Sequence, residues 1–189
     1  MIFKSQQPDI DLPETDLTSV VFGRVDELGE KPALIEGTTG RTLTYNQLRE
    51  QTNKFSAGLN ERGFKKGDVM AIFIPNMPEY AVIFLGVAAV GGINTTVNSL
   101  YSTADLVHQF NDSGAKFLIT IPEFLDRALP AASQCGIEEI IVLGEAEGTT
   151  PFTALLDNDG NAPEVDIDPR NDLVSLPYSS GTTGLSKGV

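Results

Sequence analysis

The final residues of the chain combine glycines, hydroxyl side chains and one lysine. They read YSSGTTGLSKGV over residues 178–189. Glycine takes backbone angles that are closed to other residues, so backbone amides can converge on a ligand. Hydroxyl groups donate hydrogen bonds to phosphate oxygens, and lysine adds a compact positive charge. We therefore expect a phosphate-binding loop, and its predicted binding residues are Ser179, Ser180, Gly181, Thr182, Thr183, Gly184 and Lys187.

The tetrapeptide GTTG occurs twice, which provides a control within the sequence. Residues 37–40 lie between two short predicted strands, where a turn explains them. Residues 181–184 instead follow the apolar segment 172–178, and loops after the carboxyl ends of parallel strands are where α/β proteins bind ligands. The loop is not the P-loop of kinases and ATPases, because Ser186 and Gly188 stand where that pattern needs glycine and a hydroxyl residue.

Strands and helices alternate along the chain before this loop. Continuous apolar runs predict buried strands, and apolar residues at helical spacing predict helices. The predicted elements are a helix over 17–28 capped by Asp16, a hairpin of 33–37 and 41–45, a helix over 45–59, a strand over 69–74, a buried helix capped by Asn76 and Glu79, a helix from Ser102 or Thr103 to Phe110, a strand over 116–121, a helix over 122–134, and strands over 138–142 and 172–178. This alternation predicts an α/β fold with largely parallel sheets and covering helices.

Composition and charge exclude several classes of protein. The chain has 26 acidic and 13 basic residues, a net charge of −13, and no basic stripe that could replace counterions on a nucleic acid. The longest apolar stretch, 81–90, is too short to span a bilayer, and we find no secretory signal, so membrane insertion is not expected. Cys135 is the only cysteine, which excludes an internal disulfide and favours a cytoplasmic protein.

Several motifs in order resemble one enzyme superfamily. LPYSSGTTGLSKGV (176–189) is similar to the signature phosphate loop of adenylate-forming enzymes. TLTYNQL (42–48) resembles their early L-T-Y-x-x-L motif, and residues 67–120 resemble the block that follows, including its N-x-x-E-Y element. The chain looks closest to the branch of 4-coumarate–CoA ligases and luciferases. Ser186 replaces the usual proline, which affects the stiffness of the loop more than its phosphate donors.

The resemblance implies a fold, a reaction and a set of cofactors. It implies a truncated N-terminal part of the adenylate-forming fold, with residues 1–15 as a surface arm and 16–189 as an incomplete AMP-binding domain ending in the phosphate loop. It implies an acid–thiol ligase, in which an aryl or fatty carboxylic acid reacts with ATP to give an acyl-adenylate and pyrophosphate, and coenzyme A then displaces AMP to form a thioester. The implied cofactors are ATP, Mg²⁺ and coenzyme A.

In this family the catalytic residues follow the phosphate loop, so the resemblance assigns none to this chain, which we expect to be inactive alone. Open sheet edges would then favour self-association. His108 has no neighbouring metal-ligating residue and is expected to be structural or exposed, and Cys135 is expected to be a passive thiol. Two other functions stay open on the residues: a self-contained phosphate- or nucleotide-binding module, and a non-catalytic interaction domain.

Overall fold

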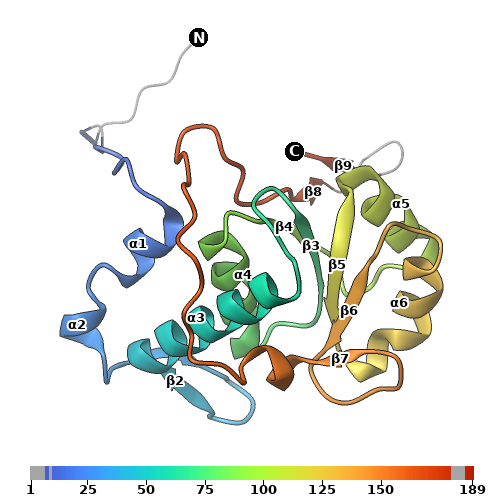
Figure 1. Cartoon of the computed structure of the whole chain (residues 1–189), viewed down its shortest axis with the longest axis horizontal. Helices are drawn as coiled ribbons and strands as arrows, with labels where there is room; N and C mark the ends of the chain where they lie inside the picture. Colours follow the sequence, from blue (N-terminus) through green and yellow to red (C-terminus); the bar gives the residue numbers. More distant parts are fainter. Residues whose placement is uncertain (1–6, 9, 180–185) are drawn as a thin grey trace.

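The computed structural model describes residues 7–8, 10–179 and 186–189, and it has an α/β fold (Figure 1). Its main sheet has five parallel strands in the order β4-β3-β5-β6-β7. These strands are β3 (Val69–Phe73), β4 (Ile93–Thr96), β5 (Ala115–Thr120), β6 (Glu139–Val142) and β7 (Thr150–Pro151). The predicted α/β class with a parallel sheet is confirmed. Because β4 and β5 lie on opposite sides of β3, the strand order reverses at β3, and ligands bind α/β sheets at such reversals.

Helices cover both faces of this sheet, as Figure 1 shows. One face packs on α3 (Tyr45–Glu61) and α4 (Pro78–Ala89), and the other on α5 (Thr103–Ser113) and α6 (Leu125–Ala132). Alternate side chains of β3 enter the two cores, Met70 and Ile72 on the first face and Ala71 and Phe73 on the second. All of β3 is buried, as expected for a parallel strand between two helical layers. No helix of the described residues combines the length and the apolar character needed to cross a bilayer.

The first helical region is two short helices rather than the single predicted helix over 17–28. They are α1 (Leu17–Phe22) and α2 (Val25–Leu28). The chain leaves the helical conformation at Arg24, where φ is −117° and ψ is 16°, directly after Gly23. Glycine has the weakest helix propensity after proline, which favours a break there. The prediction that Asp16 caps the start is confirmed, since its side chain accepts a hydrogen bond from the Ser19 amide at 2.9 Å.

The predicted hairpin is present as β1 (Pro32–Ile35) paired antiparallel with β2 (Thr42–Thr44). The first GTTG copy therefore joins two antiparallel strands.

The helix that follows β3, α4, starts differently from the prediction. Its N-cap is Met77 rather than Asn76, and Pro78 occupies the first helical position, which proline favours. No side chain caps the helix, because methionine has no oxygen to accept from the amides of the first turn. Glu79 instead accepts two hydrogen bonds from Arg41, at 2.5 and 2.7 Å.

The predicted helices and strands between residues 102 and 142 are present, whereas β4 and β7 were not predicted. Ser102 caps α5 through a capping box with Asp105, which settles the choice between Ser102 and Thr103. The predicted helix over 122–134 is a 3₁₀ turn, η1 (Pro122–Phe124), followed by α6. A second 3₁₀ turn, η2 (Phe152–Leu155), follows β7, and residues 157–166 form the expected loop. Figure 1 shows the chain after η2 running back across α3 toward the far end of the sheet.

Segment 172–178 is not the continuous strand that its apolar character predicts. It makes one isolated parallel bridge, Ser175 with Asn94 of β4, flanked by backbone hydrogen bonds of 2.9 and 2.8 Å. The pairing stops after Leu176, whose carbonyl accepts a hydrogen bond from the Thr95 hydroxyl at 3.0 Å instead of from a β4 amide. The chain enters a separate two-stranded sheet, in which β8 (Tyr178–Ser179) pairs antiparallel with β9 (Lys187–Gly188).

Candidate functional site

Two of the predicted phosphate-binding residues lie opposite each other across the β8–β9 hairpin. Ser179 and Lys187 are paired in the antiparallel register, and the Ser179 hydroxyl lies 3.4 Å from the Lys187 carbonyl oxygen, to which it donates. Both side chains are exposed. The other predicted residues lie outside the described part of the chain, namely Ser180, Gly181, Thr182, Thr183 and Gly184. The structure therefore brings together the two ends of the predicted loop.

A polar recess of about 440 Å³ lies beside β8, at the carboxyl ends of β3 and β4. Asn76 and Tyr80 line it on the β3 side, Asn98 and Ser99 line it on the β4 side, and Tyr178 closes it next to the predicted loop. Burial raises the pKa of the Tyr80 phenol, partly offset by a hydrogen bond with Thr96. The sequence analysis missed this recess, because it predicted the strand over 69–74 but not β4, so the polar residues 98–99 were not recognised as following a strand.

Helix α5 contacts β8 and the residue that precedes β9. The Tyr178 hydroxyl donates to a carboxylate oxygen of Asp112 at 2.6 Å, and His108 Nε2 lies 2.7 Å from the Ser186 carbonyl oxygen. The His108 and Tyr178 rings pack edge to face, with centroids 6.4 Å apart. Burial raises the pKa of Tyr178, and the Asp112 carboxylate raises it further. His108 thus has the structural role that was one of its two expected roles.

Buried polar side chains of β4 fix the segment that leads into β8. Asn94 donates from Nδ2 to the Val174 carbonyl at 3.2 Å, and the Thr95 hydroxyl donates to the Leu176 carbonyl at 3.0 Å. Gln109 of α5 donates from Nε2 to the Thr95 hydroxyl at 2.8 Å, so it supports this contact from behind. All three polar side chains belong to fully buried residues. Buried hydrogen bonds of this kind fix geometry, because a lost partner leaves an unsatisfied polar group.

Charge at the hairpin favours an anionic ligand. Within the described ranges, Lys187 forms no ion pair, whereas Lys66 is bound to Asp172 at 2.6 Å and Lys116 to Asp68 at 2.7 Å. The Lys187 ammonium is therefore available to a phosphate. Among residues 7–8, 10–179 and 186–189, no group of three or more histidine, cysteine, aspartate or glutamate side chains could hold a metal ion.

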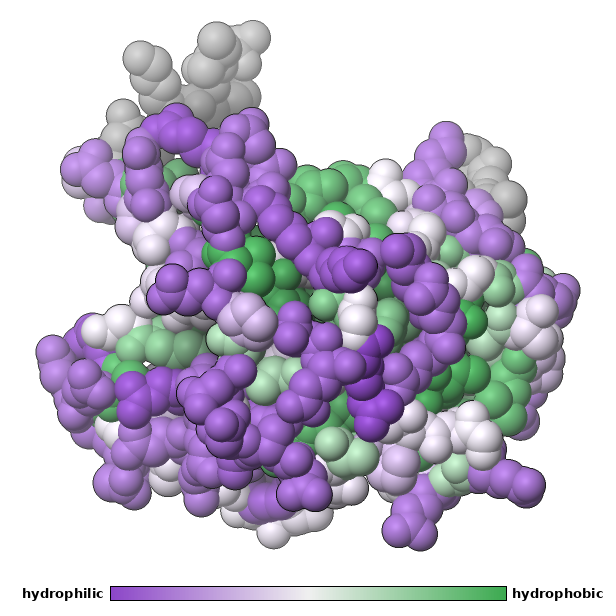
Figure 2. Space-filling model, viewed as in Figure 1, coloured by the Kyte–Doolittle hydropathy of each residue, from purple (hydrophilic) through white to green (hydrophobic). Residues whose placement is uncertain are grey.

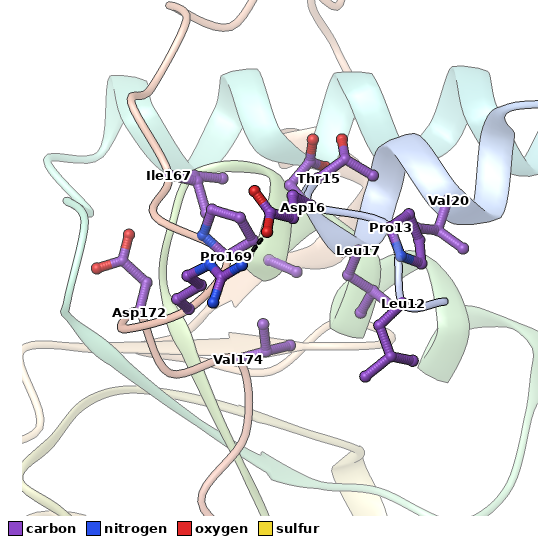
Figure 3. A pocket seen from close by; sticks show the side chains of 13 residues that line it. Leu12, Pro13, Thr15, Asp16, Leu17, Val20, Ile167, Pro169, Asp172 and Val174 are labelled. Atoms are coloured by element: carbon purple, nitrogen blue, oxygen red, sulfur yellow. Dashed lines mark hydrogen bonds and ion pairs between the residues drawn. The ribbon is translucent and has the colours of Figure 1, made fainter. Parts of the chain in front are cut away.

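A larger cavity, of about 650 Å³, lies elsewhere, between residues 12–20 and 167–174. Figure 3 shows apolar side chains around it, among them Leu12, Leu17 and Val174. It includes none of the predicted phosphate-binding residues. Arg170 and Glu14 at its rim form an ion pair with each other. The cavity thus offers an apolar surface rather than the phosphate site that the sequence predicts.

The fold is shared with a solved CoA ligase and with the solved N-terminal domain of another protein. The structure of the anthranilate CoA ligase AuaEII in complex with anthranoyl-AMP matches with a TM-score of 0.87 at 26% identity, over 94% of this chain and 35% of that one. The N-terminal domain of FACL13 from Mycobacterium tuberculosis matches with a TM-score of 0.81 at 24% identity, over 92% of this chain and 43% of that one.

The sequence shows to which family the chain belongs. Residues 22–189 match the family described as AMP-binding enzyme, and the chain belongs to that family. It is 38% identical to 4-coumarate–CoA ligase 2 from Petroselinum crispum and to 4-coumarate–CoA ligase 2 from Solanum tuberosum, in each case over the whole chain and 35% of the relative. The chain thus spans about a third of the length of these relatives.

Proposed function

We propose that this chain supplies the phosphate-binding part of a carboxylate–CoA ligase. The observation that carries the proposal is the β8–β9 hairpin, which holds Ser179 and Lys187 opposite each other beside the polar recess at the carboxyl ends of β3 and β4. Membership of the AMP-binding enzyme family and the likeness to 4-coumarate–CoA ligases support the reaction type. We propose that residues 16–189 form one incomplete domain and that residues 1–15 form a surface arm.

The proposed reaction has two steps. A carboxylate oxygen attacks the α-phosphorus of ATP, and the bond from that phosphorus to the bridging oxygen breaks, so that pyrophosphate leaves. The sulfur of coenzyme A then attacks the carbonyl carbon of the acyl-adenylate, AMP leaves with the bonding electron pair, and the thiol proton is released. The acid is proposed to be aryl or fatty, and because ATP and coenzyme A are abundant inside cells, we propose a cytoplasmic location.

The chain's contribution to the first step is electrostatic. Lys187 and the hydroxyl of Ser179 are proposed to hold the β- and γ-phosphates and to stabilise the charge that develops on the leaving pyrophosphate. Ser180, Gly181, Thr182, Thr183 and Gly184 are proposed to complete the loop. Mg²⁺ commonly accompanies polyphosphates and keeps several water ligands. The described residues offer no cluster of metal ligands, so we assign no residue to Mg²⁺.

The test compares thioester formation by the complete protein with that by residues 1–189 alone. Each is supplied with ATP, Mg²⁺, coenzyme A and a hydroxycinnamic, benzoic or fatty acid. We expect thioester from the complete protein and none from the shorter chain, because the catalytic groups lie outside it. If the complete protein releases neither pyrophosphate nor thioester with any acid, the proposal is wrong and the hairpin is only a binding or packing element.

A further inference from the structure

One face of helix α5 holds the residues that flank the predicted phosphate loop on both sides. His108 and Asp112 are four residues apart, so their side chains lie one above the other on the helix surface. Asp112 binds the hydroxyl of Tyr178, which directly precedes Ser179, and His108 binds the carbonyl of Ser186, which directly precedes Lys187. The two residues that we propose to bind phosphate therefore each adjoin a contact from the same helix.

The chemistry of each contact fixes its direction. A backbone carbonyl can only accept, so His108 must carry its hydrogen on Nε2 and donate it to Ser186. The phenol of Tyr178 donates to a carboxylate, which makes a charge-assisted hydrogen bond. The edge-to-face packing of the His108 and Tyr178 rings joins the two contacts into one unit.

Helix α5 itself is firmly placed. Its first turn is closed by the capping box of Ser102 and Asp105, and Leu106 and Phe110 are buried in the core beneath the sheet. A third residue of the helix, Gln109, supports Thr95 and so the carbonyl of Leu176, two residues before Tyr178. A rigid element thus controls the approach to the loop, its first strand and its return strand.

We propose that His108 and Asp112 are positioning residues, which set the spacing of Ser179 and Lys187 for a polyphosphate. This inference rests on the proposed function. A loop whose ends are held in the bound geometry loses less conformational freedom on binding, so affinity depends on these contacts without either residue touching the ligand. We name the pair, with Tyr178, the α5 clamp.

The first experiment tests the clamp without any ligand. His108 is the only histidine of the chain, so a long-range ¹H–¹⁵N NMR spectrum of residues 1–189 reports one imidazole ring. We expect the neutral ring to be the Nε2–H tautomer. We also expect slow exchange of the Val189 amide, which donates to the Pro177 carbonyl at 3.0 Å, and faster exchange of this amide in His108→Ala. An Nδ1–H tautomer, or exchange that is unchanged in the variant, would overturn the clamp even if the chain binds phosphate.

The second experiment measures the affinity of pyrophosphate for the same chain by calorimetry. We expect His108→Ala and Tyr178→Phe each to weaken binding about fivefold, the effect of one lost hydrogen bond. His108→Gln keeps an N–H group near the position of Nε2 and should restore binding, whereas His108→Asn is too short to do so. Asn111→Ala, an exposed residue of the same helix, is the matched control and should leave the affinity unchanged.

Thermal unfolding of each variant shows whether it remains folded. If folded His108→Ala and Tyr178→Phe bind pyrophosphate as tightly as the original chain, the positioning role is wrong. If the original chain binds no pyrophosphate, the proposed phosphate site fails in this chain, while the tautomer and the exchange rates still decide whether the clamp exists.

Discussion

Lys187 is the residue on which the proposed phosphate chemistry depends most. It stands at the start of β9, exposed, and has no ion pair within the part of the chain that the structure describes. Its type and its place beside glycines were readable from the sequence. Its position opposite Ser179 was not, because a strand pairing depends on where the chain returns in space. The same holds for the contact between Tyr178 and Asp112, which joins residues 66 positions apart.

Replacing Lys187 should weaken polyphosphate binding more than removing any single positioning contact. We expect Lys187→Ala to lower the affinity of residues 1–189 for pyrophosphate about tenfold or more, because hydrogen bonds to charged groups contribute more than neutral ones. Lys187→Arg should retain most of the affinity. The control is Lys65→Ala, which removes the same charge from an exposed site. Equal losses in Lys65→Ala and Lys187→Ala would show that only net charge matters.

The low pKa of Asp16 predicts that the folded chain loses stability in acid. Burial raises the pKa of its carboxyl, but hydrogen bonds from Ser19 and Thr18 outweigh burial and lower it to about 2. Because the folded pKa lies below the unfolded value of 3.8, this stabilisation is present above about pH 4 and is lost as the pH falls toward 2.

The variant Asp16→Ala measures this contribution. At pH 7 we expect its free energy of unfolding to be about 1 kcal/mol lower, the usual cost of losing a helix N-cap. The difference in the free energy of unfolding between the original chain and Asp16→Ala should shrink as the pH is lowered from 4 to 2. Urea unfolding at each pH measures this difference. Asp16→Asn, which keeps a capping oxygen, should lose less stability and show a weaker dependence on pH.

At the scale of elements, the sequence patterns that predicted strands and helices correctly are those in which apolar side chains are buried against a neighbouring layer. Segment 69–74 is apolar throughout and becomes β3, with every residue buried between two helical layers. Segment 172–178 contains Asp172 and Ser175 among its apolar residues and forms only one bridge to β4, and Leu173 is 58% exposed. The break between α1 and α2 depends on one glycine, and the start of α4 at Met77 depends on one proline. The spacing of apolar residues therefore predicts neither boundary.

The packing of α3 against η2 gives a test at this scale. A Cβ atom on Gly58 would lie 2.4 Å from the Leu155 carbonyl oxygen and 2.7 Å from the Leu155 Cα. Both are backbone atoms that cannot rotate away. Alanine gains about 1 kcal/mol of helix propensity over glycine, but overpacking costs about 1–3 kcal/mol.

We therefore expect Gly58→Ala to destabilise the chain by about 1 kcal/mol or more, despite its better propensity. The matched control is Gly37→Ala in the hairpin turn, where a Cβ meets nothing within 4 Å, and which should change stability very little. Urea unfolding of both variants is the measurement. A more stable Gly58→Ala variant would mean that η2 moves away from α3 without cost.

At the scale of the whole molecule, we propose that the chain self-associates through an exposed sheet edge. Figure 2 shows a largely hydrophilic face interrupted by hydrophobic patches. Segment 174–176 pairs with β4 on one side and with no other strand of the described residues, and Leu173 is exposed next to it. Such an edge can pair with another chain.

We expect light scattering of residues 1–189 to show oligomers that increase with concentration. Leu173→Lys should reduce them, because a charge on an edge strand opposes pairing. Leu129→Lys introduces the same charge at an exposed leucine of α6, away from this edge, and should leave them unchanged. A single monomeric species over a wide range of concentration would contradict the proposal.

The bridge between β4 and segment 174–176 also has a consequence for the order of folding. It joins residues 80 positions apart, such as Asn94 and Val174, whereas β3, β4 and β5 are joined through connections that are complete long before residue 174 is synthesised. Contacts between distant residues require a larger loss of chain entropy and form late. We therefore expect segment 174–176, which leads into the phosphate loop, to gain its structure last and to lose it first. Hydrogen exchange during refolding would show this as late protection of the Leu176 amide.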